Sequence, residues 1–504
     1  MDRRQFLRIG LVSAGGAAAL PSVATAAPTQ ASGGGPYGSL DGIDPDENGV
    51  ILPEGFTSRI VAVGGEPVGD TTYDWHIFPD GAATFDDGED GWYHVCNSEV
   101  FVAGLGGVSA IHFGSDGEIL DAYPLLVGSV ANCAGGPTPW GTWLSCEEDL
   151  LEQGIVWECD PTGQREAVAH PAMGKWAHEA VAVDPVEERL YMTQDNPTGL
   201  LYRYTPTAYP DLSHGLLEAA TVADNGAVTW ADVPDPSGES APTREQVEGA
   251  TVFLGGEGIW YHDDLIYFCT KYDNVVHSID LRAQLYSEIY RPTPEEEAAD
   301  TAILSGVDNI TVDEGTGDLF IAEDGGNMEV VVITPDGDVA PFLRVADQHE
   351  SEITGPVFNP RRDRLYFSSQ RGPSPKAVRD IVPGFDSPLT NAGITYEVSG
   401  PFRGIVAEPV ETTTTTEVVE EPETAEPKVS PTTIPSPTTT LGQAAENSTA
   451  PVSSDDDDGN DGMVIGIGVG VAAAAVAGGA LLALRNRRSA GASGEPDNDA
   501  DKAT

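Results

Sequence analysis

The sequence is poor in basic residues and in cysteine. Its 504 residues include 25 lysines and arginines against 81 aspartates and glutamates, a formal net charge of −56. A face that binds nucleic acid needs clustered positive charge, so this balance excludes nucleic acid as a partner. Five cysteines are present and none form a C-x-x-C pair, which argues against a zinc ribbon or a thioredoxin-like motif.

The cysteines stand at positions 96, 133, 146, 159 and 269. An odd number in an exported protein leaves at least one thiol unpaired or otherwise used. A disulfide between Cys133 and Cys159 is one possibility. Cys269 ends the apolar run Leu265 to Cys269 and is interpreted as a core residue.

The N-terminus has the pattern of an export signal. Arg3 and Arg4 precede Phe6-Leu7, a weakly apolar Gly/Ala-rich stretch follows, and Ala24-Thr25-Ala26 resembles a processing site. This predicts a twin-arginine signal over residues 1–26, with the twin-arginine translocation machinery as a partner. An ordinary secretory signal is the alternative. The twin-arginine route carries folded proteins, which suits a protein that acquires metal inside the cell.

The C-terminal hundred residues predict a membrane tether. Residues 406–462 are rich in Thr, Pro and Glu and are expected to form a disordered linker. Residues 463–484 are uncharged and long enough for a transmembrane helix. Arg485, Arg487 and Arg488 follow, so residues 485–504 are expected to be a cytoplasmic tail. The folded domain, residues 40–405, would then lie on the cell surface, anchored to the membrane, as a monomer.

The folded region lacks long segments of helical period and instead repeats a strand–turn–strand unit. The four full copies begin at Glu179, Glu257, Asp308 and Glu352, and two partial copies contain Trp92 to Cys96 and Gly141 to Ser145. Six copies built only from strands predict an all-β, six-bladed β-propeller. A β-sandwich array is the competing architecture, but it does not explain why acids recur at strand starts.

In a propeller the inner strand of each blade lines a central channel, so residues at equivalent positions converge on one axis. Carboxylates gathered there would repel each other unless cations lie among them. The predicted metal ligands are the four acids that open the full units, together with residues at the ends of the following strands: Glu179, Glu257, Asp308, Glu352, Asn97, Glu99, Cys146, Glu147, Glu148 and Glu323. His178, beside Glu179, is weighed as a ligand or as a core residue. Lys271 and Arg371 are predicted to hold an anionic substrate.

One stretch indicates which metals to expect. Asn132 to Glu148 runs through Gly, Pro and Trp and ends in Cys146-Glu147-Glu148. Hard cations such as calcium take carboxylate oxygen, and iron also accepts thiolate, so the stretch predicts part of a mixed metal site.

The same stretch, with Lys175 to Pro185 and Ser351 to Pro356, resembles the PhoX-type alkaline phosphatases over about residues 49–404. The resemblance implies a six-bladed propeller that holds iron and calcium, so the cofactors predicted are Fe³⁺ and Ca²⁺. It implies Cys146 and Glu147 as iron ligands, with Glu99, Glu179, Glu257 and Glu352 as further metal ligands. It implies hydrolysis of small phosphate monoesters without a serine nucleophile, by a metal-bound water or oxide. Two other hypotheses remain open: a calcium-dependent lactonase or esterase, and a non-catalytic binding propeller at the cell surface.

Overall fold

In the computed structural model, the residues described are 29–30, 34–299, 301–373, 378–382 and 391–404. The predicted signal peptide, linker, transmembrane segment and tail therefore all lie outside the described residues. Within the described part, no helix is both long and apolar enough to cross a bilayer.

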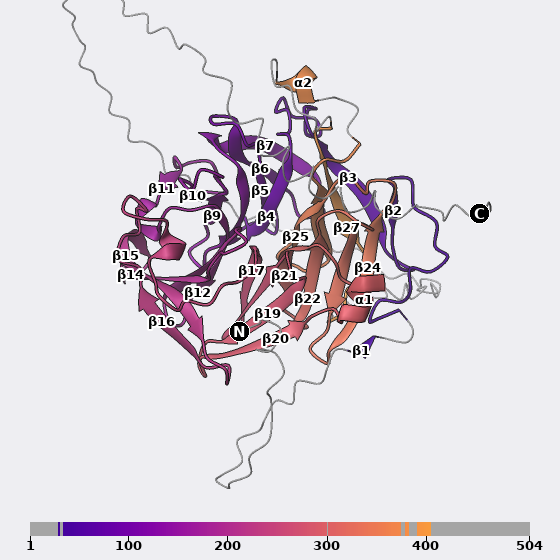
Figure 1. Cartoon of the computed structure of the whole chain (residues 1–504). Helices are drawn as coiled ribbons and strands as arrows, with labels where there is room; N and C mark the ends of the chain where they lie inside the picture. Colours follow the sequence, from indigo (N-terminus) through magenta and orange to yellow (C-terminus); the bar gives the residue numbers. More distant parts are fainter. Residues whose placement is uncertain (1–28, 31–33, 300, 374–377, 383–390, 405–504) are drawn as a thin grey trace, which may run out of the picture. The chain divides into compact units, whose positions relative to one another are not determined.

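The described residues form six antiparallel sheets (Figure 1). The first three are β4 (Pro79–Asp86), β5 (Trp92–Ser98), β6 (Gly106–Phe113) and β7 (Ile119–Ser129); β8 (Asn132–Pro137), β9 (Trp143–Glu147), β10 (Val156–Cys159) and β11 (Val168–Ala169); and β12 (His178–Asp184), β13 (Arg189–Gln194), β14 (Tyr202–Ala208), β15 (Asp211–Val222) and β16 (Val228–Asp232).

The other three are β17 (Gly256–His262), β18 (Leu265–Thr270), β19 (Val275–Asp280) and β20 (Leu285–Tyr290); β21 (Val307–Asp313), β22 (Asp318–Glu323), β23 (Glu329–Ile333) and β24 (Asp338–Val345), with β1 (Thr29–Gln30) and β2 (Val50–Ile51) added on β24; and β25 (Ile353–Phe358), β26 (Arg364–Ser369), β27 (Ile394–Ser399) and β3 (Thr57–Val63). The short helices are α1 (Pro294–Ala299), α2 (Val378–Ile381), η2 (Pro171–Met173) and η3 (Thr243–Glu245).

The six sheets are the blades of a propeller, so the predicted architecture is confirmed. The inner strands touch in a closed ring, in the order β4, β8, β12, β17, β21, β25 and back to β4. Figure 1 shows β4, β17, β21 and β25 gathered at the centre of the domain. The apolar cores lie between neighbouring blades; Leu144 and Val156 of blade 2, for example, pack with Val181 and Leu190 of blade 3.

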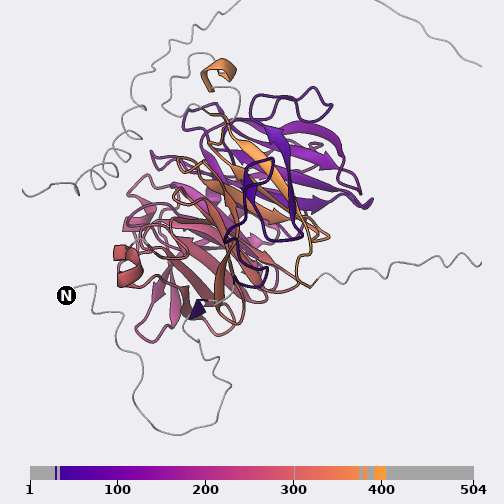
Figure 2. The ribbon, with the colours of Figure 1, turned by 90° about the vertical axis from the view of Figure 1, so that its right-hand side faces the viewer.

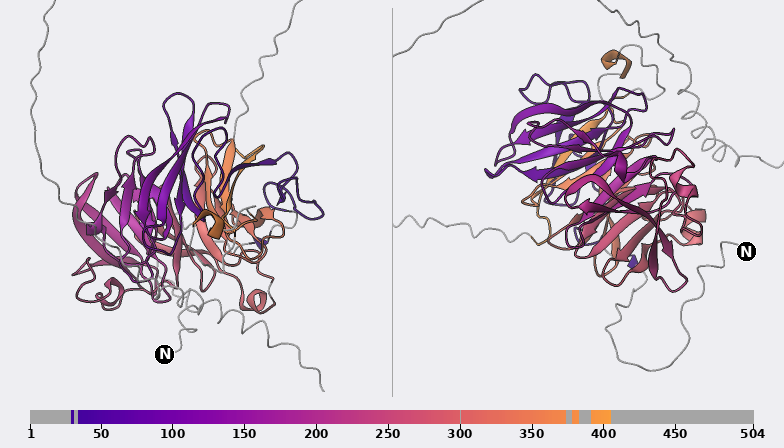
Figure 3. Two further views of the ribbon diagram at one scale, coloured as in Figure 1. Left: turned by 90° about the horizontal axis from the view of Figure 1, so that it is seen from above. Right: turned by 90° about the vertical axis from the view of Figure 1, so that its left-hand side faces the viewer.

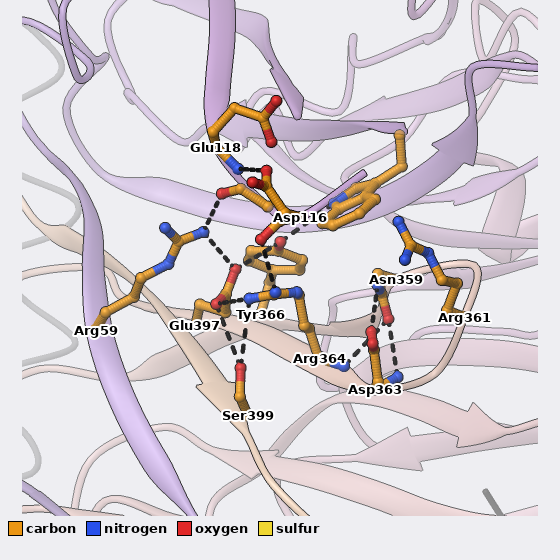
Figure 4. Close-up of polar contacts among 12 residues, drawn as sticks. Arg59, Asp116, Glu118, Asn359, Arg361, Asp363, Arg364, Tyr366, Glu397 and Ser399 are labelled. Atoms are coloured by element: carbon orange, nitrogen blue, oxygen red, sulfur yellow. Dashed lines mark hydrogen bonds and ion pairs between the residues drawn. The ribbon is translucent and has the colours of Figure 1, made fainter. Parts of the chain in front are cut away.

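The ring closes because the last blade takes its outer strand from the start of the domain. β3 pairs with β27, and in Figures 2 and 3 the orange strands of blade 6 lie beside the indigo and purple strands of blade 1. Figure 4 shows the ion pairs that support this closure. Glu397 of β27 accepts from Arg59 of β3 at 2.7 Å and from Arg364 of β26 at 2.6 Å. Arg364 also donates to the carbonyl of Asp116 in blade 1 at 2.9 Å.

The inner strands approach too closely for ordinary side chains at several positions. A Cβ on Gly81 would lie 2.4 Å from Cα of Ala134, and one on Gly136 would lie 1.8 Å from the carbonyl oxygen of Val181. Glycine is therefore required where blades 1, 2 and 3 meet at the hub. This close packing fixes the ends of the inner strands relative to one another, and those ends carry the candidate site.

Candidate metal centre

The inner strand of every blade has the same irregularity near its start. The first residue of each inner strand pairs with the last residue of the second strand, as His178 does with Gln194, and the pairing register then shifts. Such a bulge redirects the side chain next to it. The residues that follow the first position make an inner ring: Asp80, Cys133, Glu179, Glu257, Asp308 and Thr354.

A second ring comes from the chain just beyond the second strand of each blade. Its members are Glu99, Glu148, Asp195, Lys271, Asp324 and Gln370. A residue inside a second strand projects toward a neighbouring blade, whereas a residue beyond its end can reach over the hub. The two rings therefore bring twelve positions from all six blades to one end of the channel.

Most members of the two rings line a single cavity of about 50 Å³. The lining residues are Asp80, Glu99, Cys133, Glu148, Glu179, Glu257, Lys271, Val307, Asp308, Asp324 and Glu352. Eight of these are carboxylates and one is a lysine, so the cavity is strongly anionic. Asp80, Glu179 and Glu257 are at most 3% exposed, which means that solvent screens their charges poorly.

Burial and mutual repulsion raise the pKa of these acids. Burial is the largest cause for Asp80, Glu148 and Glu179, followed by the charge of Glu99, Asp195 and Asp308 respectively. The pKa of Asp308 rises to about 7, again chiefly through burial. Burial likewise raises the pKa of the Cys133 thiol well above its usual range. A site that holds protons this tightly can exchange them for bound cations, which stabilise the ionised ligands.

The donor atoms are grouped closely enough to share cations. Three sets of possible ligand atoms each lie within 4.8 Å of one another: Asp80, Glu99 and Cys133; Cys133, Glu148 and Glu179; and Glu179, Glu257 and Asp308. Cys133 and Glu179 each belong to two sets, so the sets form one continuous chain across blades 1 to 5. Carboxylates suit calcium, and a thiolate among them suits iron, so the donor set fits both predicted ions.

Three polar side chains hold the acids in place. Lys271 Nζ lies 2.7 Å from both Asp195 Oδ2 and Glu257 Oε1. Arg371 Nη2 donates to Glu352 Oε2 at 2.8 Å and lies 3.4 Å from Asp324 Oδ1. Gln370 Nε2 donates to Asp80 Oδ2 at 2.5 Å and to Glu99 Oε2 at 2.7 Å.

Most of the predicted site residues are brought together. Seven of them line the cavity: Glu99, Glu148, Glu179, Glu257, Lys271, Asp308 and Glu352. Glu352 precedes β25 and so lies two residues before the ring position, which Thr354 occupies. Arg371 contacts the cavity through Glu352.

Four predicted ligands lie elsewhere, three of them in hydrogen-bonded structural roles. Asn97 donates to the carbonyls of Cys133 and Ala134, at 3.0 and 2.8 Å, and so supports β8 from behind. Glu147 accepts from the N–H of Ile155, and Glu323 accepts from the N–H groups of Ser305 and Glu329. These contacts fix loops and strands outside the cavity.

The fourth is Cys146, which is fully buried in the apolar core between blades 2 and 3 with Leu144, Val156 and Trp176. It lies inside β9, and its side chain projects toward blade 3 rather than over the hub. The thiol that lines the cavity is Cys133, whose Sγ lies 3.3 Å from Glu179 Oε1.

Several other residues can now be placed. His178 stacks on Trp176 and contacts the carbonyl of Gly174 at 3.1 Å, and burial lowers its pKa to about 3; it is a core residue. Cys269 is a core residue as predicted. All five cysteines are free thiols, so the possible pairing of Cys133 with Cys159 is not formed. Asp80 and Cys133 were missed as site residues; each is the second residue of its inner strand, a position that can be compared between blades once β4 and β8 are located.

A family model described as alkaline phosphatase PhoX matches residues 109–372, which include every cavity-lining residue except Asp80 and Glu99. The chain belongs to the PhoX alkaline phosphatase family. It is therefore a phosphoric monoester hydrolase, of a family that depends on metal ions.

A solved structure supports the fold, and others resemble the chain more weakly. PhoX of Pseudomonas fluorescens, solved in complex with vanadate as a transition state analogue, superposes with a TM-score of 0.56 at 16% identity, covering 72% of this chain and 98% of that one. A gluconolactonase from Xanthomonas campestris gives a TM-score of 0.37 at 14% identity, covering 65% of this chain and 88% of that one. Regucalcin of Agrobacterium tumefaciens gives 0.34 at 16% identity, covering 69% and 96%. No curated protein sequence matches this chain significantly.

Proposed function

We propose that the cavity is the phosphatase active site and that its acids and Cys133 hold calcium and iron. The observation that carries this proposal is the convergence of eight carboxylates and one thiol, from all six blades, on about 50 Å³ of buried space. Without cations such a cavity would repel a phosphate dianion. Bound calcium and iron would neutralise the carboxylates and act as Lewis acids toward the phosphate oxygens.

The chain's own cations orient the substrate. Lys271 forms ion pairs with Asp195 and Glu257, and because an ammonium group has three donors it can also donate to a phosphate oxygen. Arg371 is held in place by Glu352 and Asp324 through Nη2 and by Gln370 through Nη1, and the remaining N–H groups of its planar guanidinium suit the same phosphate group. Since these two residues come from blades 4 and 6, they contact a phosphate from different sides.

The hub also contains a second, smaller cavity of about 20 Å³, lined by small residues of the inner strands. Gly81, Gly258 and Gly355 line it, and a Cβ on any of them would lie 2.7 Å or less from backbone atoms of the next blade. These glycines therefore let the inner strands pack closely next to the proposed active site.

The proposal is tested by matched charge-neutral variants of one buried and one exposed glutamate. Glu179 belongs to two ligand sets, whereas Glu166 is exposed and outside the cavity. We expect Glu179→Gln to lower bound metal and phosphomonoesterase activity by about 100-fold or more, and Glu166→Gln to change neither. The measurements are elemental analysis and hydrolysis of a simple alkyl phosphate. A fully active Glu179→Gln protein, or wild-type protein that keeps its activity after complete metal removal, would contradict the proposal.

We further propose that the protein is exported by the twin-arginine route and anchored with the propeller outside the cell, as the residues outside the described part predict. Replacing Arg3 and Arg4 with lysine should retain the protein in the cytoplasm. Deleting residues 463–484 should release it into the medium. If the variant with lysine at positions 3 and 4 can still be labelled at the cell surface, the protein is exported by a different route. The two sequence alternatives, a lactonase and a non-catalytic module, gain no support from the family match.

A further inference from the structure

A partly exposed aromatic residue lies beside the cavity residue Lys271. It is Tyr272, which directly follows Lys271 in the chain and is 48% exposed. Lys271 Nζ lies 6.0 Å from the centre of this ring. The side chain that is placed to bind phosphate therefore has an aromatic neighbour within the reach of a small ester group.

The ring is held by the chain beneath it. The N–H of Tyr272 donates to the carbonyl of Leu254 at 3.1 Å, and Gly255 lies against the ring. A Cβ on Gly255 would be 2.6 Å from two ring carbons, so only glycine lets the ring lie this close to the backbone. One side of the ring is thus fixed against the protein, and the exposed side is available for contact.

The pKa of the Tyr272 hydroxyl also reflects its closeness to the charged residues of the site. Burial is the first cause that raises the pKa of Tyr272, and the charge of Asp195 is the second. Lys271, Glu257 and Glu148 contribute as well. The hydroxyl therefore lies within electrostatic range of acids and a cation from both rings, which agrees with a position at the mouth.

A loop that follows another cavity residue also carries exposed apolar side chains. Leu150 and Leu151 follow the cavity residue Glu148 and are 49% and 80% exposed. Their loop reaches the same sector, because Glu152 accepts from Asn196 at 3.1 Å and the carbonyl of Asn196 accepts from the N–H of Gly255 at 3.0 Å. The two exposed leucines therefore belong to a loop that is linked to the segment of Tyr272 through Asn196.

We propose that Tyr272 is a specificity-determining residue that stacks on the leaving group and directs the enzyme toward phosphate monoesters of aromatic alcohols. The inference rests on the proposed function of the cavity. Aromatic rings stack with centres roughly 4.5–7 Å apart, a range that an ester held at Lys271 can meet. The phosphate is bound by the cavity, and the ring of the alcohol lies on Tyr272 outside it.

The test compares two esters of similar size, benzyl phosphate and cyclohexylmethyl phosphate, with the metal-loaded full-length enzyme. Both release a primary alcohol, and they differ in whether the ring is aromatic. We expect the ratio of their kcat/KM values to favour benzyl phosphate. Tyr272→Leu, which keeps apolar bulk but removes the ring, should lower that ratio about five- to tenfold. Tyr272→Phe should preserve it.

A matched control lies on the same blade. Tyr261 is half-buried near the far end of β17 and bonds to Asp264, away from the cavity. Tyr261→Leu should leave the ratio unchanged, and thermal unfolding would verify that each variant is folded. An unchanged ratio in folded Tyr272→Leu overturns the proposal while leaving the phosphatase assignment intact. Failure of the metal-loaded wild type to hydrolyse either ester would instead overturn the proposed function, and this inference with it.

Discussion

The two buried thiols Cys133 and Cys146 offer a test in which stability and metal binding separate. Both are buried, with exposed fractions of 7% for Cys133 and 0% for Cys146, but only Cys133 lines the cavity. Replacing either with alanine removes one sulfur atom from a packed interior. That change costs about 1–2 kcal/mol, from lost apolar burial and the small void left behind.

The cost in metal affinity should differ sharply between them. Cys133 belongs to two of the three ligand sets, whereas Cys146 packs among Leu144, Val156 and Trp176. Loss of a residue that only hydrogen-bonds to a metal ligand already lowers metal affinity about 10–100-fold, so loss of a direct ligand should cost at least that much. We therefore expect Cys133→Ala to lose iron and phosphatase activity, and Cys146→Ala to keep both with a modestly lower melting temperature.

The assay is reconstitution with Fe³⁺ and Ca²⁺, followed by elemental analysis, thermal unfolding and visible absorption. A thiolate bound to iron gives charge-transfer absorption, which should be present in wild type and Cys146→Ala and absent in Cys133→Ala. The reverse pattern would show that the protein rearranges to bring Cys146 into the site. A colourless wild type that retains full activity would remove iron from the proposal altogether.

Three further predictions concern a glycine at the hub, an acid of the cavity and the arginine that is proposed to bind the substrate. Gly136→Ala places a Cβ against the carbonyl of Val181 and should lower the melting temperature by several degrees or prevent folding, as measured by calorimetry. The raised pKa of Asp308, about 7 in the fold, means that the metal-free protein holds this proton more tightly than the unfolded chain does. Its contribution to stability is therefore present below about pH 4 and is lost as the pH rises toward 7. The stability of Asp308→Asn should therefore depend less on pH in that range. Urea unfolding at several pH values measures this, and an equal change of the unfolding free energy with pH in the variant and the wild type would contradict the prediction. Arg371→Lys keeps the charge but loses the fork, so KM for a phosphate ester should rise about tenfold with little change in kcat, whereas Arg361→Lys, far from the cavity, should change neither.

The architecture could be predicted because the blades repeat. The units that begin at Glu179, Glu257 and Asp308 are each an acid, an apolar strand, a turn and a second strand, and the structure has β12–β13, β17–β18 and β21–β22 there. Each strand is buried between two blades, which keeps its sequence apolar and easy to recognise. The count of six blades followed from this regularity.

The inner strands of blades 1 and 2 could not be recognised in the same way. β4 contains Asp80-Gly81-Ala82-Ala83, and β8 contains Cys133-Ala134-Gly135-Gly136, so neither has the β-branched run of a typical strand. The structure explains the composition, since close contact at the hub excludes larger side chains. The same contact that hides these strands also positions Asp80 and Cys133, which is why both site residues were missed.

Cys146 was chosen over Cys133 as a metal ligand because of the residues next to it in the sequence. Cys146 is followed by two glutamates, whereas Cys133 is followed by alanine and glycine. Sequence adjacency does not decide which residues face a propeller axis. Cys133 is the second residue of an inner strand, the position that Glu179 and Glu257 hold in their blades. Position within the repeat, rather than local composition, identifies the thiol that can reach the channel.

The repeated units form the scaffold, and the positions at which a blade departs from the repeat make the charge distribution of the cavity asymmetric. If all twelve ring positions were acidic, the cavity would bind cations equally on every side and would have no place for an anion. Instead Lys271 replaces an acid in blade 4, and blade 6 contributes the neutral Thr354 and Gln370, followed by Arg371. Carboxylates and the thiol of blades 1 to 5 form the chain of ligand sets, while the positive groups stand at blades 4 and 6. A phosphate that contacts both Lys271 and Arg371 must therefore lie across the blade 5 side of the mouth, with its ester group free to turn toward the ring of Tyr272.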